Sequence, residues 1–329
     1  MTSGTQALDP RRTRGPRHGL GVGLVVLGAL CFTVNAGVSR VALRSGVQPA
    51  MLTTIRVTCT FLVLLVAASL FRRTALQPPR GRMLALVVAL GVVGVAGLQW
   101  TYFVAIDRLP VGMALLLEYQ APILVALWAR FARHEPVRPR MWLGLALAVG
   151  GLAAATEVWK GAKFDGLGVL AGLAAALCFA CYFLIGEAGV GELDPLRVII
   201  WSFGIATVAL NVVTPITGFD TARLDDQVSL LGALDSHEVP LWLVLAWVIV
   251  LGTLVPFFAD LVALSFVAAT TVTVIAMLEP IGVSALGWVW FGETLGPVAV
   301  VGCIAVVAGI LIAQSARRDH LQVEPPAPT

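Results

Sequence analysis

The sequence is poor in charged residues. Only 12% of its 329 residues are Asp, Glu, Lys or Arg, against about 25% in an ordinary soluble domain. Hydrophobic residues make up 58% of the chain, and the mean hydropathy is +0.91. Lysine is nearly absent, and the arginines lie between apolar runs without forming a continuous basic stripe. The composition therefore indicates a multi-pass membrane protein and argues against a nucleic-acid partner.

Several catalytic signatures are also missing. There is no G-x-x-x-x-G-K-[ST] loop, so ATP is not expected to drive the protein. There is no H-E-x-x-H or G-x-S-x-G motif, and none of the four histidines lies within an apolar run. We therefore do not expect an intramembrane enzyme, and we expect no metal and no cofactor.

The five cysteines all lie in apolar runs, so we expect buried thiols and no disulfides. Cys178 and Cys181 have the C-x-x-C spacing of redox and metal motifs. No histidine or second cysteine pair completes such a site, so two small residues on one helix face is the favoured interpretation.

Long apolar runs fill most of the chain, and a run of about 20 residues is enough to cross a membrane as a helix. We expect an all-α integral membrane protein with ten transmembrane helices, at residues 19–42, 49–71, 83–106, 110–131, 140–157, 166–187, 195–214, 240–264, 267–291 and 297–314. The first run is too long for a signal peptide, so residues 1–18 are interpreted as a cytosolic tail. Residues 315–329 are polar and proline-rich, and we expect a disordered cytosolic tail there.

The arginines set the expected orientation, because cytoplasmic loops carry an excess of positive charge. With both termini in the cytosol, most arginines between spans fall inside, and the bias is clearest in the first half of the chain. The acidic loop 215–240 then falls on the extracytoplasmic side.

An internal repeat is visible. Ala29–Phe32 recurs as Ala176–Phe179, an offset of 147 residues. Pro122 recurs as Pro280 at an offset of 158, and Gly144 and Gly151 recur as Gly302 and Gly309 at the same offset. Five spans per unit is an odd number, so two units must enter the membrane in opposite directions. We therefore expect two inverted-topology five-helix repeats, at residues 19–157 and 166–314, with a substrate site between them.

Two proline-containing turns interrupt apolar runs. Glu118, Tyr119 and Gln120 lie just before Pro122, and Glu279 lies just before Pro280. A proline cannot donate to the carbonyl four residues earlier, so both prolines are expected to kink their helices. A carboxylate at membrane depth costs several kcal/mol unless it is paired or faces water, which makes both acids candidates for function.

Counting 1.5 Å per residue from the helix ends places Asn35, Arg56, Gln99 and Glu118 at one level, roughly 10–12 Å below the outer surface. The repeat predicts a mirrored inner layer, in which Asn35 corresponds to Tyr182, Arg56 to Ser202, Tyr102 to Asp260 and Ala121 to Glu279. The candidate substrate-binding residues are Asn35, Arg56, Gln99, Tyr102, Glu118, Tyr119, Gln120, Tyr182, Asp260 and Glu279. Arg56 and Glu118 are expected to be partners, since pairing lowers the cost of both charges.

Structural interpretations stand beside these. Asn35 and Gln99 could only join neighbouring helices. Arg56 could extend to the outer interface, Asp260 could reach the inner headgroups, and Tyr102 could belong to an aromatic belt.

The sequence resembles the drug/metabolite transporter superfamily, in its EamA-like group. The resemblance rests on Leu278–Pro280 followed by Phe291–Leu295, and on Leu117–Pro122 followed by Glu135. Arg108–Glu118, taken with Met277–Pro280, is most similar to the threonine/homoserine exporter branch. The resemblance implies ten helices in two homologous halves and an alternating-access carrier in the bacterial cytoplasmic (inner) membrane.

From the residues and the resemblance together we expect a secondary transporter that exports small metabolites such as amino acids. Its partners would be a small-molecule substrate, the lipid bilayer and a candidate coupling proton. The alternatives are a non-transporting sensor or scaffold, a drug exporter, and an importer of another metabolite.

Overall fold

The structure is a computed structural model and describes residues 16–109, 111–135, 137–155, 159, 165–292 and 296–318. Residues 16–18 and 315–318 are helical, although the sequence analysis assigned them to the tails 1–18 and 315–329. The remaining tail residues, 1–15 and 319–329, and Glu293 lie outside the described residues.

The first repeat unit contains five spans. They are α1 (Pro16–Arg44), α2 (Pro49–Phe71), the continuous segment α3 (Arg82–Ala89), η3 (Leu90–Gly97) and α4 (Leu98–Arg108), the interrupted pair α5 (Val111–Glu118) and α6 (Ala121–Phe131), and α7 (Pro139–Ala155). A short 3₁₀ turn, η2 (Arg73–Leu76), follows α2.

The second unit repeats this order. Its spans are α8 (Gly166–Glu192), α9 (Pro195–Val213), the continuous segment α10 (Leu241–Ile249), η7 (Val250–Leu254) and α11 (Val255–Ala263), the interrupted pair α12 (Ala269–Ala276) and α13 (Leu278–Phe291), and α14 (Pro297–Arg318). Among the described residues, eight helical segments have the length and apolar character to cross a membrane, and α7 and α14 are shorter apolar helices. The expected all-α fold with ten spans is confirmed.

Local chemistry accounts for several helix starts. Pro49 and Pro195 occupy the first turn of α2 and α9, where their fixed φ suits a helix and no N–H is needed. Asp165 caps α8 by accepting a hydrogen bond from the Gly168 N–H at 2.8 Å. That bond, together with Arg108 nearby, holds the pKa of Asp165 below its usual range.

The third span of each repeat contains a π-helical segment, η3 in one and η7 in the other. In each segment a glycine lets another helix approach closely. A Cβ on Gly94 would meet Tyr182, and a Cβ on Gly252 would overlap Asn35. Asn35 and Tyr182 are themselves repeat-related positions. The two repeats therefore pack across each other in the same way, as a two-fold pseudo-symmetric pair requires.

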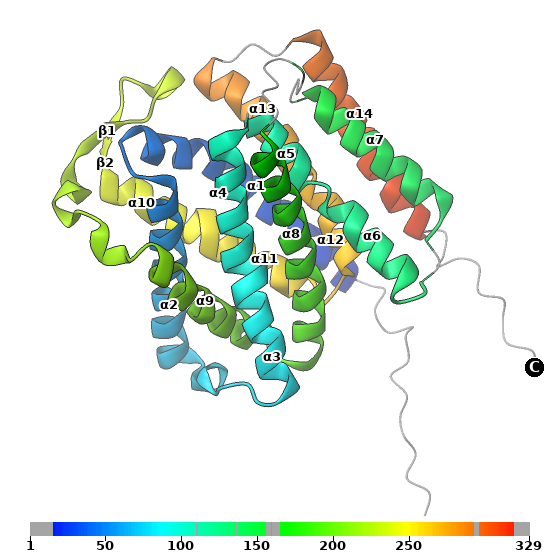
Figure 1. The fold of residues 1–329 in the computed structure, drawn as a ribbon, viewed down its shortest axis with the longest axis horizontal. Coiled ribbons are helices and arrows are strands. Elements are labelled where there is room, and N and C mark those ends of the chain that lie inside the picture. Colours follow the sequence, from blue (N-terminus) through cyan, green and yellow to red (C-terminus); the bar gives the residue numbers. More distant parts are fainter. Residues whose placement is uncertain are drawn as a thin grey trace, which may run out of the picture.

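The last span of each repeat packs against its counterpart, and α7 and α14 lie side by side at one edge of the molecule (Figure 1). Gly144 lies against Gly309, and Gly151 lies against Gly302. The glycines identified as repeat equivalents thus form the contact themselves, and they allow close backbone approach between membrane helices.

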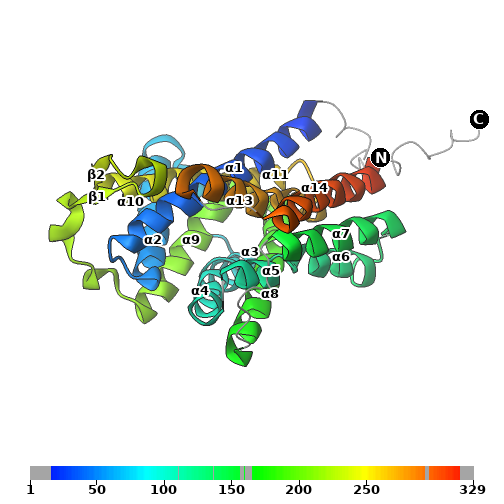
Figure 2. The same ribbon diagram turned by 90° about the horizontal axis from the view of Figure 1, so that it is seen from above.

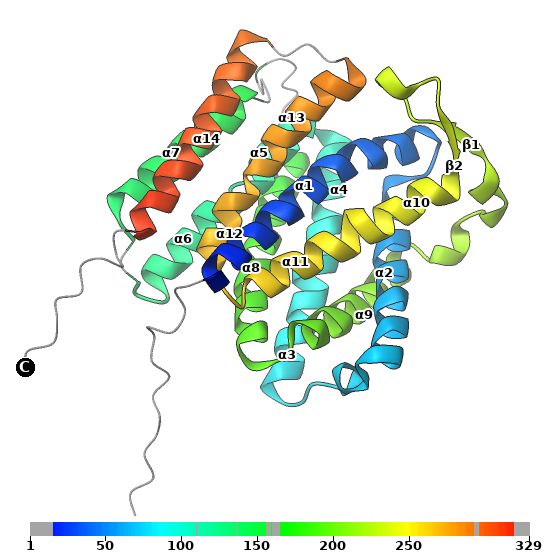
Figure 3. The ribbon, with the colours of Figure 1, turned by 180° about the vertical axis from the view of Figure 1, so that it is seen from behind.

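The central spans form two layers. Figure 2 shows α1, α10, α11 and α13 lying over α4, α5 and α8. Seen from behind, α1 runs beside α10 and α11 across this face (Figure 3). Each of the two layers therefore contains helices from both repeats.

The segment 215–240 folds over the C-terminal end of α1 and the N-terminal end of α10. It contains three 3₁₀ turns and a hairpin, whose elements are η4 (Ile216–Gly218), η5 (Thr221–Asp225), β1 (Gln227–Ser229), η6 (Gly232–Leu234) and β2 (Glu238–Pro240). The strands pair antiparallel with Val228 opposite Val239. Apolar side chains of this segment pack on buried residues such as Val41 and Leu245. The acidic loop is therefore a folded cap.

Candidate functional site

A cavity of about 690 Å³ lies between the two repeats. Nine of the ten candidate residues line it, namely Asn35, Arg56, Gln99, Tyr102, Glu118, Tyr119, Tyr182, Asp260 and Glu279. They come from α1, α2, α4, α5, α8, α11 and α13 and from the break after α5. Helices of both repeats therefore supply the polar wall.

Arg56 is one of three arginines that line the cavity, with Arg40 and Arg44. It interacts electrostatically with Glu118, Glu279 and the Tyr102 hydroxyl. In the described part of the chain, Arg56 and Glu118 form no direct ion pair, and the buried Arg56 Nε has no hydrogen-bond partner. Arg56, Glu118 and Glu279 thus line one cavity without a direct ion pair among the described residues, which leaves room for a ligand that carries both charges.

The two proline-containing turns meet in the wall of the cavity. The helix is interrupted between Glu118 and Ala121 in the first repeat and at Met277 in the second. The Tyr119 hydroxyl donates a hydrogen bond to Glu279 Oε2 at 2.7 Å. This bond fixes the Glu279 carboxylate while its other oxygen remains available to a ligand.

The amide side chains lie on the walls beside these charges. Asn35 and Gln99 are buried, and Asn35 Oδ1 accepts a hydrogen bond from the Ser39 hydroxyl at 3.3 Å. Ser39 follows Asn35 by one helical turn and also lines the cavity. Both amides therefore sit where they can bond a substrate as well as join helices.

Aromatic rings line one end of the cavity, and Arg40 and Arg44 line the other end. Phe257 packs edge-on against Phe32, Tyr182 and Phe203, with ring centroids 5.3–5.5 Å apart. The Tyr182 hydroxyl donates to the Phe257 carbonyl at 3.3 Å.

Asp260 lies at this aromatic end. It is 5% exposed, and its Oδ1 has no hydrogen-bond partner within the described residues. A carboxyl oxygen buried in this way is costly unless it gains a proton or a cation.

Two polar positions lie outside the cavity wall. Gln120 donates to the carbonyl of Leu116 at 2.9 Å, so its amide is used by its own broken helix. Ser202, the repeat equivalent of Arg56, is fully buried and bonds the carbonyl of Ile199.

The sequence interpretation missed part of the lining. Arg40 and Arg44 lie near the C-terminal end of α1, and Phe32 and Leu43 lie on the same helix. Together with Ser39 they form a stripe at three- and four-residue spacing. That periodicity, extended from Asn35 along the helix, was the signal that could have found them.

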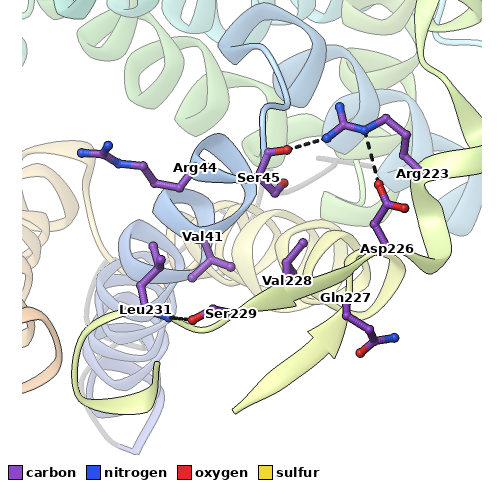
Figure 4. A pocket seen from close by; sticks show the side chains of 9 residues that line it. All are labelled: Val41, Arg44, Ser45, Arg223, Asp226, Gln227, Val228, Ser229 and Leu231. Atoms are coloured by element: carbon purple, nitrogen blue, oxygen red, sulfur yellow. Dashed lines mark hydrogen bonds and ion pairs between the residues drawn. The ribbon is translucent and has the colours of Figure 1, made fainter. Parts of the chain in front are cut away.

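A second, more open cavity of about 490 Å³ lies outside the first, beneath the folded cap (Figure 4). Arg223 donates to the carbonyl of Ser45 and lies 3.5 Å from a carboxylate oxygen of Asp226 (Figure 4). Arg44 lines both cavities. The cap is thereby fastened to the end of α1 beside the mouth of the central cavity.

No cluster of three or more His, Cys, Asp or Glu side chains in the described ranges could hold a metal ion. The arrangement offers charge recognition and reversible binding of protons or ammonium groups.

Comparison with known proteins gives relatives of one kind. The model of the EamA-like transporter family matches residues 19–156 and 166–314. The threonine/homoserine exporter RhtA of Escherichia coli is 27% identical over 224 residues, which is 66% of this chain. The match spans 66% of the exporter's length, just under two thirds. An uncharacterized transporter of Archaeoglobus fulgidus is 27% identical over 65% of this chain and 70% of its own length.

A solved crystal structure shares the fold. It superposes with a TM-score of 0.72 at 20% sequence identity, covering 91% of this chain and 98% of the other. The family model matches two successive stretches of the chain, which together contain all ten spans. The chain belongs to the EamA-like transporter family of membrane proteins.

Proposed function

We propose that this protein exports a small zwitterionic metabolite, an amino acid, by alternating access across the bacterial cytoplasmic membrane. The observation that carries the proposal is that Arg56, Glu118 and Glu279 line one cavity with no direct ion pair between them among the described residues. An amino acid carries both charges on neighbouring atoms and can complete both halves of this arrangement.

In the proposed complex, Arg56 binds the substrate carboxylate through its planar, multidentate guanidinium. Glu118 or Glu279 binds the ammonium group, and Asn35 and Gln99 bond the remaining polar atoms. The cavity volume lies within the range of about 300–1,000 Å³ that small-molecule sites occupy. A carboxylate that holds either an ammonium or a proton, but not both, supports exchange of substrate for protons.

The arrangement of the walls supports alternating access. The polar cavity extends to Arg40 and Arg44 at one end and is closed by aromatic rings at the other. With the termini in the cytosol, the end of the cavity lined by Arg40 and Arg44 faces outward. Rocking of one repeat against the other would then expose the same charges to the cytosol.

The name of the Escherichia coli relative supports an amino-acid substrate and the export direction. A non-transporting sensor or scaffold, a drug exporter and an importer remain the alternative hypotheses. The deep Asp260 carboxyl and the two repeat-related turns favour a carrier, because a scaffold has no use for costly charges at membrane depth.

Purified protein in proteoliposomes tests the proposal. Vesicles are loaded in turn with threonine, homoserine, other amino acids or a drug panel, and efflux is followed with and without a proton gradient. We expect faster efflux of at least one small amino acid than from protein-free vesicles, with a response to the gradient. Absence of efflux for every amino acid, or efflux of drugs alone, contradicts the proposal.

A further inference from the structure

The two ends of the bundle each carry a side-chain contact between the repeats, and the two contacts occupy repeat-related positions. At the inner end, Arg133 Nη1 lies 2.5 Å from Glu187 Oε2. At the outer end, the Arg40 guanidinium lies over the Phe291 ring, 4.3 Å from its centroid. The offset of 147 residues relates Arg40 to Glu187, and the offset of 158 relates Arg133 to Phe291.

The inner contact is more than a surface ion pair. Its side chains are 36% exposed for Arg133 and 17% for Glu187. Glu187 Oε1 also accepts a hydrogen bond at 2.9 Å from the Ala269 N–H, at the start of α12. One carboxylate on α8 thus joins the end of α6 to the beginning of the interrupted span that carries Glu279.

Other ion pairs between the repeats at this end are far more exposed. The Arg82–Glu192 side chains are 77% and 52% exposed, and the Arg72–Asp194 side chains are 66% and 49% exposed. Exposed pairs contribute little because water screens them. Glu187 is therefore the acid at this end whose interactions change most when the repeats separate.

The outer contact has a different reinforcement. Phe291 stacks on Trp290 with ring centroids 5.2 Å apart. The Trp290 indole N–H donates to the carbonyl of Leu230 in the cap at 3.1 Å. Arg40 and Phe291 both line the central cavity, so this contact lies at its mouth and is supported by the segment 215–240.

We propose that Arg133–Glu187 and Arg40–Phe291 are the inner and outer gate contacts of the transport cycle, formed by equivalent positions of the two repeats. The proposal rests on the proposed carrier function. Weakening the contact at one end of the bundle raises the population of the conformation that is open at that end. It lowers the population of the conformation that is open at the other end. The four side chains position the repeats and do not bind substrate in the charged centre.

Labelling of a single cysteine measures the inner opening. Ala263 is fully buried on α11, one helical turn from Asp260 toward the inner end. The five native cysteines are replaced by alanine, Ala263→Cys is introduced, and inside-out vesicles are treated with an impermeant maleimide. Glu187→Gln should raise the labelling rate about tenfold, which corresponds to about 1.4 kcal/mol of population shift. The glutamine oxygen retains the bond from Ala269.

Glu192→Gln is the matched control, with the same substitution at the same end, and it should leave the labelling rate unchanged. The charge exchange Arg133→Glu with Glu187→Arg should return the rate toward the starting value. Adding Phe291→Ala to Glu187→Gln should also lower the rate, because it weakens the opposite gate, whereas Phe291→Tyr retains a ring and should not.

An unchanged rate in Glu187→Gln overturns the inference, even where efflux establishes the carrier. A rate that rises further on adding Phe291→Ala also overturns it, since both changes would then only loosen the fold. Conversely, labelling that follows the expected pattern in a protein with no efflux supports the gates and contradicts the carrier function.

Discussion

Replacement of Glu279 by glutamine is expected to lower substrate flux by about 10- to 150-fold, because a hydrogen bond to a charged group contributes about 1.5–3 kcal/mol. The remaining flux should no longer respond to a proton gradient, since glutamine does not exchange a proton. The fold should persist, because the glutamine carbonyl can still accept the bond from Tyr119 that Glu279 now accepts. Proteoliposome flux with and without the gradient is the measurement.

The same substitution elsewhere provides the control. Glu238→Gln changes an exposed acid on β2, far from the charged centre, and should leave flux within about twofold. Glu118→Gln should act in the same direction as Glu279→Gln. If both cavity variants transport normally and keep their response to the gradient, the assignment of the site is wrong.

Removal of the Arg56 side chain by Arg56→Ala is expected to raise the substrate KM by about 100-fold, because the loss of one partner of a buried charge pair costs several kcal/mol. The acids of the cavity also lose the cation with which they interact. Arg56→Lys keeps the charge but not the fork of donors, so its effect should be smaller. Initial rates of uptake or efflux over a range of substrate concentrations give the KM.

Arg82→Ala serves as the arginine control. This side chain is exposed, and its ion pair with Glu192 is not part of the cavity wall, so the KM should change by less than about twofold. A neutral result for Arg56→Ala would show that Arg56 serves the outer interface and not the substrate.

The spans were predictable because each apolar run must bury its backbone polar groups in a helix. The repeat was predictable because Gly144, Gly151, Gly302 and Gly309 keep their spacing, and the structure shows why this spacing matters: the four glycines form the α7–α14 contact. The clustering of Arg56 with Glu118 followed from depth counting. The absence of a direct Arg56–Glu118 ion pair could not be predicted in this way, because depth gives the level of a side chain in the membrane and not its direction around the helix axis.

Other features depend on tertiary contacts that no local pattern reveals. Gln120 was grouped with Tyr119 as a binding residue. In the broken helix, Tyr119 lies in the cavity wall, whereas Gln120 donates to the carbonyl of Leu116. Phe257 closes the cavity only because Phe32, Tyr182 and Phe203 arrive from three other helices. The hairpin in 215–240 is stabilised by apolar packing on α1 and α10, which the acidic composition of this segment concealed.

Ligand analogues that lack one charge test directly whether the cavity recognises both charges of one ligand. The melting temperature of the purified protein is measured with the best-transported amino acid, with its amino alcohol that lacks the carboxylate, and with its hydroxy acid that lacks the ammonium group. A site that binds both charges predicts that the amino acid raises the Tm and that neither analogue does at the same concentration. An analogue that raises the Tm as much as the amino acid would contradict it.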